Sequence, residues 1–321
     1  MANRDWIKDF VACYDVTDSA DLAIGRARII KAANLPKRLY KFRGVSDYSL
    51  DNLKAGTVWM CSPLKFNDPY DCAATISARQ ITGGTIELPE AILSRLRGSL
   101  NDLEIAEALA SNNPIFRIVE LVLLKDTSVP REKVPGMVEA LLGAQEHVLQ
   151  PLLDRNIASV REGIKVCSFC EDHETILMWS HYASNHTGFC MEYKIPQLEE
   201  HVIRMLYPVI YDRARFDVTR FHKAAIQNGL DAFNNVYSVL QALYKAPEWA
   251  YEREWRFVLN FGILDSDQNV SFGNPSRVYL GAQMPTEYKK EASEICKQKG
   301  IPLSQMQLSK TEYRMVAEPL S

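Results

Sequence analysis

"RLYKFRGVSDYSLDNLKAGTVWMCSP", residues 38–63, predicts a strand, a short helix and a second strand in close succession. The first segment, "RLYKFRG", is rich in aromatic residues and ends at Gly44. A helix is expected from the capping residue Ser49 to the stop at Gly56. "TVWMCSP" then has the β-branched and aromatic residues of another strand. This unit predicts a sheet with helices packed beside it.

Helical patterns lie before this unit and interrupt the strands after it. Residues 4–34 place apolar side chains at helical spacing and predict two short helices, which Pro36 stops. From about residue 86 to 161, leucine and alanine recur at helical spacing between proline breaks. We therefore expect an N-terminal helical segment (1–36) and a single α+β domain (37–321) that carries a helical insert (86–161).

The other strand-like segments are short and scattered along the chain. They are "IKVCSFC", "TGFCMEYKI", "MLYPVIYD" and, after helical residues 217–245, "EREWRFVLNF". The tail reads as a strand, a helix and two further strands. The predicted fold class is α+β, with a mixed or antiparallel β-sheet core.

Composition excludes several classes of protein. The 321 residues are 47% hydrophobic and 24% charged, with a net charge of -3, so no global basic field draws the chain to nucleic acid or an anionic membrane. No apolar run approaches the length of a membrane span, and the start lacks a secretory pattern. Seven scattered cysteines indicate reduced thiols. We expect a cytoplasmic protein that does not enter membranes.

The stretch "KFNDPYDC", residues 65–72, crowds polar side chains between two apolar segments. Asn67 and Asp68 before Pro69 suit a turn, because their short side chains bond nearby backbone. The turn does not require Asp71. We expect Asp71 to support a site from behind, by holding Arg43 or His181 in place.

The stretch "ETILMWSHYASNHTGFCMEY", residues 174–193, gathers aromatic and histidine side chains. Trp179, His181 and Tyr182 suit a pocket that stacks on a flat ring, although a histidine here also suits a cap on buried backbone. Just before it, Cys167, Cys170 and His173 spell half of a zinc site. No second such pair follows, and alternation along a strand explains the cysteines more simply. We expect no metal.

The segment "YEREWRFVLNF", residues 251–261, places two glutamates and an arginine at alternate positions. In a strand, Glu252, Glu254 and Arg256 share one face. Two buried carboxylates need compensation by an arginine or a ligand. Cross-strand ion pairing and a catalytic or ligand-binding carboxylate are both consistent with this pattern. Arg43, at the end of its strand, likewise suits either a solvated edge or a phosphate contact.

Several of these motifs, in this order, resemble the bacterial and phage family filed as domain of unknown function 2971. They are "LYKFRG", "SPLKFNDPYDC", "VCSFCED", "MWSHYASNHTGFCMEY", "EREWRF" and "VYLGA", from about residue 38 to 285. The bacterial and phage occurrence suggests a toxin or phage-defence effector.

A looser resemblance supplies a chemistry. Arginine on a first strand, serine after a second and Glu-x-Glu on a late strand are similar to the order in ADP-ribosyltransferases. The resemblance implies that NAD is the substrate, that Arg43 and Ser62 bind it, and that Glu254 is the catalytic carboxylate. It further implies that Glu252 orients the acceptor and that Tyr48, Trp179 or Tyr182 stacks on nicotinamide. The expected macromolecular acceptor is a protein or a nucleic acid.

We therefore predict that Glu254 and Glu252 are catalytic, within a cleft that binds a nucleotide or dinucleotide. The remaining candidate residues are cofactor-binding (Arg43, Ser62, Tyr48, Trp179, His181, Tyr182) or supporting (Asn67, Asp68, Asp71, Arg256). One alternative is a metal-dependent nuclease or nucleotide hydrolase, with Asp68, Asp71, His181 and Glu254 around Mg²⁺ or Mn²⁺. The other is a non-catalytic nucleotide-binding module.

Overall fold

A computed structural model of the chain describes all residues except 1–4, 82–87, 232, 261 and 321. The first residues of the expected insert, 86 and 87, and the last residue of the expected late strand, 261, therefore lie outside the described residues. The fold is α+β, as the sequence predicts, and its largest sheet is mixed.

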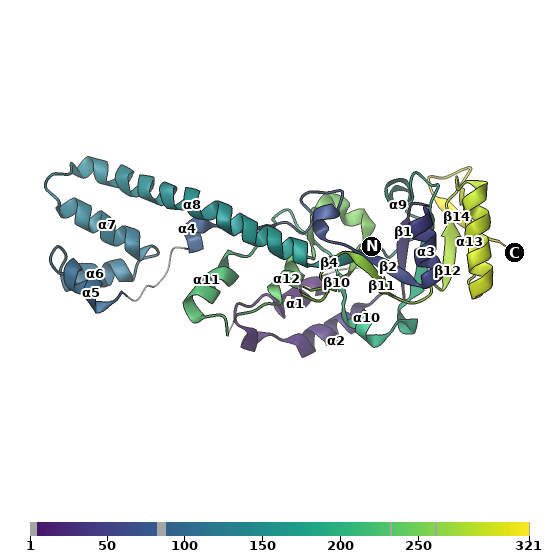
Figure 1. The fold of residues 1–321 in the computed structure, drawn as a ribbon, viewed down its shortest axis with the longest axis horizontal. Coiled ribbons are helices and arrows are strands. Elements are labelled where there is room, and N and C mark those ends of the chain that lie inside the picture. The colour runs from purple at the N-terminus through teal and green to yellow at the C-terminus, as the bar shows by residue number, and fades with distance from the viewer. Residues whose placement is uncertain (1–4, 82–87, 232, 261, 321) are drawn as a thin grey trace.

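The largest sheet has five strands. In spatial order they are β1 (Arg38–Arg43), β5 (Phe189–Lys194), β12 (Arg277–Leu280), β13 (Leu303–Leu308) and β14 (Met315–Leu320). All neighbours are antiparallel except β12 and β13. Parallel neighbours need a crossover, and helix α13 (Thr286–Lys299) supplies it at the end of the molecule that carries the C-terminus (Figure 1).

A second sheet has three antiparallel strands, in the order β4 (Lys165–Phe169), β10 (Trp255–Leu259) and β6 (Leu206–Pro208). A single backbone bridge between Tyr40 of β1 and Cys170, just after β4, joins the two sheets. Strand β2 (Thr57–Met60) pairs with β11 (Gln268–Ser271), and a bridge between Cys61 and Val166 ties β2 to β4. Residues of both sheets also share the largest hydrophobic core of the described chain, so the sheets are packed together although they share no ladder.

Short elements complete the body. Helix α3 (Asp47–Ala55) connects β1 to β2 and ends at Gly56 in the left-handed conformation, as predicted. Its cap is Ser46 rather than Ser49, because the two serines form a reciprocal capping box. The other body elements are α4 (Ala78–Ile81), α9 (Ile176–Tyr182), α10 (Glu200–Arg204), α11 (Thr219–Asn228), α12 (Tyr237–Gln241), β3 (Ala74–Thr75), β7 (Ile210–Tyr211), β8 (Phe216–Asp217) and β9 (Tyr244–Lys245), with short 3₁₀ helices at 63–65, 195–197 and 247–252. Two more 3₁₀ helices, at 19–21 and 131–133, lie outside the body.

The N-terminal region forms the two predicted helices, α1 (Trp6–Ala12) and α2 (Ile24–Asn34). They pack on the body because Phe10 and Ala27 are completely buried in a core cluster with residues of β4 and β10. The rings of Trp6 and Trp255 stack at 6.1 Å. The N-terminal helices therefore share their hydrophobic core with the second sheet.

The helices between residues 90 and 163 form an arm that extends away from both sheets (Figure 1). They are α5 (Glu90–Leu96), α6 (Asp102–Leu109), α7 (Pro114–Lys125) and the 30-residue α8 (Val134–Gly163). The arm has a small core of its own, built on Leu100, Ile105, Ala108 and Ile118. Within the described ranges, no helix is both long and apolar enough to cross a membrane.

Candidate functional site

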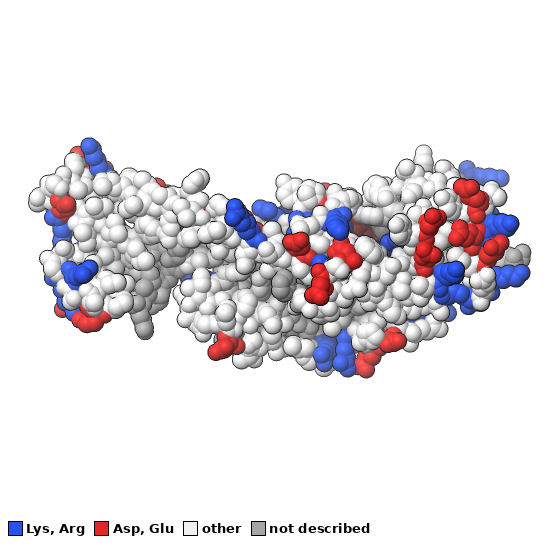
Figure 2. Space-filling model, viewed as in Figure 1, with Lys and Arg blue, Asp and Glu red and all other residues white. Residues whose placement is uncertain are grey.

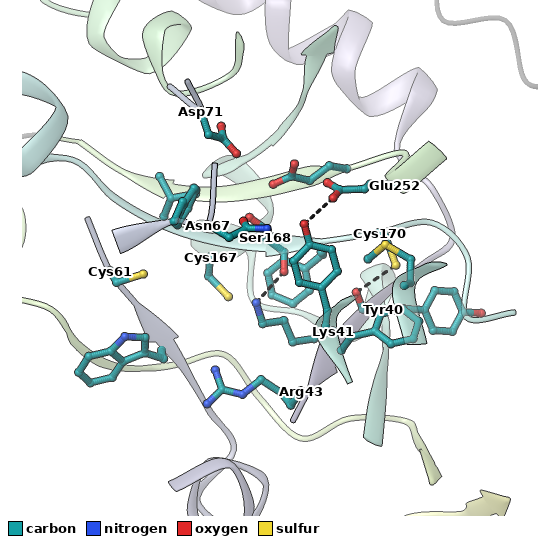
Figure 3. Close-up of a pocket in the computed structure, with 18 of the residues that line it drawn as sticks. Tyr40, Lys41, Arg43, Cys61, Asn67, Asp71, Cys167, Ser168, Cys170 and Glu252 are labelled. Carbon is teal, nitrogen blue, oxygen red and sulfur yellow. Dashed lines mark hydrogen bonds between the residues drawn. The ribbon is translucent and has the colours of Figure 1, made fainter. Parts of the chain in front are cut away.

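A cavity of about 190 Å³ lies where the two sheets meet. Strand β1 lines it with residues 40–43, and β4 and the turn after it contribute residues 166–170. The other lining residues come from β2, the following loop, α9, β9 and the segment that leads into β10: Trp59, Cys61, Phe66, Asn67, Asp71, Met178, Tyr182, Lys245, Glu252 and Glu254. Segments that are far apart in the sequence therefore build one cavity (Figure 3).

A network of buried charges forms one side of the cavity. Arg256 is completely buried, and its guanidinium donates to Asp71 Oδ1 at 2.6 Å and to Glu254 Oε1 at 2.8 Å. Lys245 Nζ donates to Glu252 Oε2 at 2.5 Å and to Glu254 Oε2 at 2.9 Å. It also lies 3.5 Å from Asp71 Oδ2. Three carboxylates therefore share two cations, which leaves a formal charge of about -1 when all five groups are ionised.

The pKa values of the two glutamates are shifted in opposite directions. Burial tends to raise the pKa of Glu254, but Arg256 and Lys245 outweigh it and lower that pKa. Burial and the neighbouring Glu254 charge raise the pKa of Glu252 to about 7, because Lys245 offsets them only in part. The Tyr182 hydroxyl donates to Glu252 Oε1 at 2.6 Å. Glu252 is therefore the carboxyl of this network that can exchange a proton near neutral pH.

Two cations lie on the other side of the cavity. Figure 3 shows Lys41 and Arg43 across from Asp71 and Glu252. Lys41 Nζ donates to the Ser168 carbonyl at 2.9 Å. Throughout the described ranges, no carboxylate lies within ion-pair distance of either cation. The cavity therefore has a cationic side and a carboxylate side.

The loop "KFNDPYDC" frames this cavity. Asn67 lines it, and Asp68 closes a turn by accepting from the Tyr70 N–H at 2.8 Å and from Trp249 Nε1 at 2.8 Å. The prediction that Asp71 holds Arg43 or His181 is wrong. Asp71 pairs with Arg256 and Lys245 instead. The sequence does not predict this pairing, because Lys245 and Arg256 are far from Asp71 along the chain and only the tertiary fold brings them together.

Four of the six residues predicted to bind the cofactor do not line the cavity. The Ser62 hydroxyl accepts from the Leu64 N–H and donates to the Arg161 carbonyl, in a separate hollow, while its neighbour Cys61 faces the cavity. The structure thus corrects the expectation that Ser62 joins Arg43 and Glu254. Tyr48 is 82% exposed on α3, and the exposed His181 bonds to Tyr251.

Trp179 is the fourth of these residues. Its ring is completely buried against Phe42, and its Nε1 donates to the His173 carbonyl at 2.6 Å. The side chain therefore belongs to the core and has no free face on which a ligand can stack. Tyr182, which was expected to stack, lines the cavity and bonds to Glu252 instead.

The late strand also differs from the prediction at its start. Strand β10 begins at Trp255, because Glu252 ends a 3₁₀ helix (Pro247–Glu252) and Arg253 has a left-handed backbone, with φ of 48°. Glu252, Glu254 and Arg256 nevertheless converge, as expected. Lys41 and Lys245 were not predicted. Lys41 alternates with Arg43 on the same strand, which is a usable sequence signal, whereas Lys245 gives none.

The structure does not bring together the residues considered as ligands of Mg²⁺ or Mn²⁺, or those considered as ligands of zinc. Asp68 and His181 bond to aromatic residues, while Asp71 and Glu254 bond to cations. Cys170 donates to the Asp172 carbonyl, and the ring of His173 packs against the rings of Tyr40 and Tyr279. No group of three or more histidine, cysteine, aspartate or glutamate residues that could hold a metal ion occurs in the described part of the chain.

Comparison with known proteins supports the first resemblance. Residues 178–257 match the family described as "Protein of unknown function (DUF2971)". The matched segment runs from α9 into β10 and carries Tyr182, Lys245, Glu252 and Glu254. No curated protein and no solved structure matches the chain. The description of the matched family names no activity, so the chemistry of the cavity is the basis for a function.

Proposed function

We propose that this chain cleaves the N-glycosidic bond of a nicotinamide dinucleotide and transfers the ADP-ribosyl group to a protein or nucleic acid. The observation that carries the proposal is the polarity of the cavity. Lys41 and Arg43, which have no carboxylate partner among the described residues, lie on one side, and Glu252 lies on the other with Glu254. A dinucleotide carries anionic phosphates at one point and a reacting ribose at another. Its charge distribution therefore complements this cavity.

Lys41 and Arg43 form the proposed phosphate contact. Both side chains are half-buried on the same face of β1. The Arg43 guanidinium offers a planar set of donors, and the Lys41 ammonium offers a point charge, so together they suit a pyrophosphate. The aromatic rings of Trp59 and Phe66 line the same cavity and offer faces for a base or a nicotinamide ring.

The carboxylate side suits the reacting ribose. When the bond between ribose C1′ and nicotinamide N1 breaks, the electron pair leaves with nicotinamide and positive charge develops on the ribose. The net negative charge of the buried Asp71, Glu252, Glu254, Lys245 and Arg256 network stabilises that charge. The acceptor then bonds to C1′ and releases a proton.

In this proposal the two glutamates exchange the roles that the resemblance implies. Both oxygens of Glu254 contact Arg256 or Lys245, so Glu254 fixes the two cations. Glu252 has the raised pKa and takes the proton that the acceptor loses. Tyr182 and Lys245 orient Glu252 through its two oxygens.

The test measures nicotinamide release from NAD and transfer of labelled ADP-ribose to a cell extract. We expect Glu252→Gln to lower both by about 100-fold, within the usual range for loss of a general base. Glu248→Gln is the matched control, because Glu248 is exposed on the same 3₁₀ helix and does not line the cavity. Its activity should equal that of the wild type. Arg43→Met should raise KM more than it lowers kcat.

Two outcomes would overturn the proposal. Tight binding of NAD without turnover in the wild type would identify a binding module, and calorimetry with Arg43→Met would then locate the nucleotide. Equal activity of wild type and Glu252→Gln would exclude Glu252 as the proton acceptor.

A further inference from the structure

A second hollow, of about 710 Å³, adjoins the cavity and carries an excess of cations. It is lined by Lys37 and Arg38 where β1 begins, by Lys194 at the end of β5, and by Arg253 just before β10. Glu171 is the one carboxylate that lines it among the residues the structure describes. We call this site the cationic hollow.

Two of these cations are held in place by carboxylates behind them. Arg38 Nε lies 3.4 Å from Glu192 Oε1, and Arg253 Nη2 lies 2.7 Å from Glu171 Oε2. The two arginine side chains are 54% and 44% exposed, whereas the two glutamate side chains are 5% and 15% exposed. An arginine has five N–H donors, so a contact with one carboxylate leaves other donors for a ligand.

The two carboxylates are themselves fixed by hydrogen bonds. Glu192 accepts from Ser276 Oγ and from the Tyr279 hydroxyl, both at 2.8 Å. Glu171 Oε1 accepts from Trp255 Nε1 at 2.8 Å. Side chains that are oriented before a ligand arrives lose less entropy when it binds. The arginines of the cationic hollow are therefore preorganised for an anion.

Gathering these cations costs the fold free energy. Arg38 and Lys194 are direct partners in the register of β1 and β5, and like charges directly opposite each other destabilise a pair of strands. Arg253 has a φ of 48°, in the left-handed region that a residue other than glycine occupies at a cost. Both costs fall in the same hollow. Backbone strain of this kind clusters at ligand-binding sites, which indicates that the hollow holds a ligand.

The hollow keeps a positive charge although the whole chain is acidic. Its four cations and the two carboxylates behind them give a formal charge of about +2, whereas the chain carries -3. Lys37 and Lys194 have no carboxylate within ion-pair distance in the described ranges. Glu199 and Glu200, the acidic residues that follow Lys194 most closely, pair with residues of α10 instead. Figure 2 shows acidic and basic side chains near one another in most charged regions of the visible face, so the excess is local.

The arrangement of the cations suits phosphate groups. A guanidinium binds two phosphate oxygens at once, and a lysine adds a point charge. The cations come from three separate segments of the chain and are spread over the hollow, which suits successive phosphates of one strand better than a single phosphate.

The hollow also adjoins the groups proposed to react. Tyr40 lines both the hollow and the cavity, and Arg253 stands between Glu252 and Glu254 in the chain. A strand bound in the hollow therefore passes beside the carboxyl proposed to accept a proton.

We propose that the cationic hollow binds the backbone phosphates of a single-stranded nucleic acid, which is the acceptor of the ADP-ribosyl group. The transfer rests on the proposed function, whereas binding by the hollow does not. As the bond between ribose C1′ and nicotinamide N1 breaks, its electron pair leaves with nicotinamide. A nitrogen or oxygen of the bound strand bonds to C1′, and Glu252 takes its proton. A single strand is expected because enzymes that modify a base act on single strands or on an extruded base.

The first test measures binding of the full chain to a fluorescent oligonucleotide of about 12 nucleotides, by anisotropy and without NAD. At about -0.7 per phosphate contact, four contacts give log K against log salt a slope of about -3. Lys37→Gln combined with Lys194→Gln should reduce that slope by about 1.4 and weaken binding at least about tenfold at about 50 mM salt. The matched control is Lys290→Gln combined with Lys297→Gln, because both lysines are exposed on α13 and outside the hollow. Its binding should equal that of the wild type.

Stability separates loss of binding from loss of folding. Lys194→Gln removes a like charge opposite Arg38, so its melting temperature should equal or exceed that of the wild type. Absence of binding by the wild type, or equal binding by the wild type and the Lys37→Gln, Lys194→Gln variant, would overturn the proposal. Polyglutamate that competes as well as unlabelled oligonucleotide would also overturn it, because the hollow would then take an acidic protein.

The second test distinguishes this inference from the proposed function. The wild type is incubated with labelled NAD, the oligonucleotide and cell-extract protein, and nicotinamide release and the label on each acceptor are measured. We expect label on the oligonucleotide, and Lys37→Gln combined with Lys194→Gln should raise the KM for it at least about tenfold. Nicotinamide release with label only on protein would overturn this inference and leave the proposed function in place. Oligonucleotide binding without nicotinamide release would support the hollow as a binding site and overturn the proposed function.

Discussion

Removing the charge of Arg256 should destabilise the chain more than the loss of an exposed ion pair does. The guanidinium is completely buried and donates to Asp71, to Glu254 and to the Ala242 carbonyl. Burial tends to lower the pKa of Arg256, but Asp71 and its other partners hold it well above the ordinary value, so the group is always charged. In Arg256→Met the side chain keeps a similar length but loses its charge and all its donors.

The expected loss follows from the charges that remain. Without Arg256, the carboxylates of Asp71, Glu252 and Glu254 share Lys245 alone, and the formal charge of the fully ionised network changes from about -1 to about -2. Breaking a buried ion pair in this way costs about 3–5 kcal/mol. That is a large part of a total stability of about 5–15 kcal/mol. Arg256→Lys keeps the charge but not the forked geometry, so we expect an intermediate loss.

The assay is urea unfolding at pH 7, followed by circular dichroism. Arg204→Met is the matched control, because Arg204 pairs with Glu200 on the surface of α10, and exposed pairs are worth about 0–1 kcal/mol. A loss below about 1 kcal/mol in Arg256→Met, or a loss equal to that of Arg204→Met, would refute the view that this network depends on a fully desolvated cation.

The remaining predictions concern pH, two glycines and one thiol. Since the pKa of Glu252 rises from the ordinary 4.5 to about 7, its proton stabilises the fold below pH 4.5 and this contribution is lost as pH rises to 7. Glu252→Gln should therefore flatten this part of the urea stability profile, and an unchanged slope would contradict the raised pKa. In Gly188→Ala the new Cβ would lie 2.1 Å from the Arg43 carbonyl oxygen. The free energy of unfolding should therefore fall by at least about 2 kcal/mol, and the melting temperature should fall with it. Gly143→Ala, in open space on α8, should instead add about 0.5–1 kcal/mol, and equal shifts would argue against the close contact. Cys61, the one cysteine of seven that is not buried, should react first with a maleimide, and NAD should slow that reaction if it fills the cavity. Peptide mass spectrometry reads out the site, and faster labelling of any other cysteine would contradict this placement.

Local patterns predicted the elements of the fold well where one face or one cap decides the conformation. The helix–strand order of the tail, the two N-terminal helices and the stop at Gly56 follow from periodicity and from backbone preferences within a few residues. The short strands β8, β9 and β11 escaped prediction, because strands this short carry too few alternating residues to form a pattern.

The sequence likewise predicted one part of the candidate site correctly and misplaced another. Glu252, Glu254 and Arg256 were expected together, since they are neighbours along the chain and need only one turn of backbone to converge. Ser62 was assigned to the wrong place because a change of direction after Met60 turns its hydroxyl into a helix cap and presents Cys61 to the cavity. Neighbouring side chains at the end of a strand point to opposite faces, so an error of one residue assigns the wrong side chain to the cavity.

The sequence by itself determined the α+β class, the long helical arm and the presence of acidic and basic residues at alternate positions, because these depend on side-chain spacing within single elements. Only the tertiary structure decided which of those charges are buried and which partners they have. Asp71 and Arg256 are separated by 185 positions in the chain yet bond at 2.6 Å, and Lys245 reaches three carboxylates from a separate strand. The pKa and the chemical role of a buried group depend on every charge within a few ångströms, and that set is assembled only when the two sheets meet.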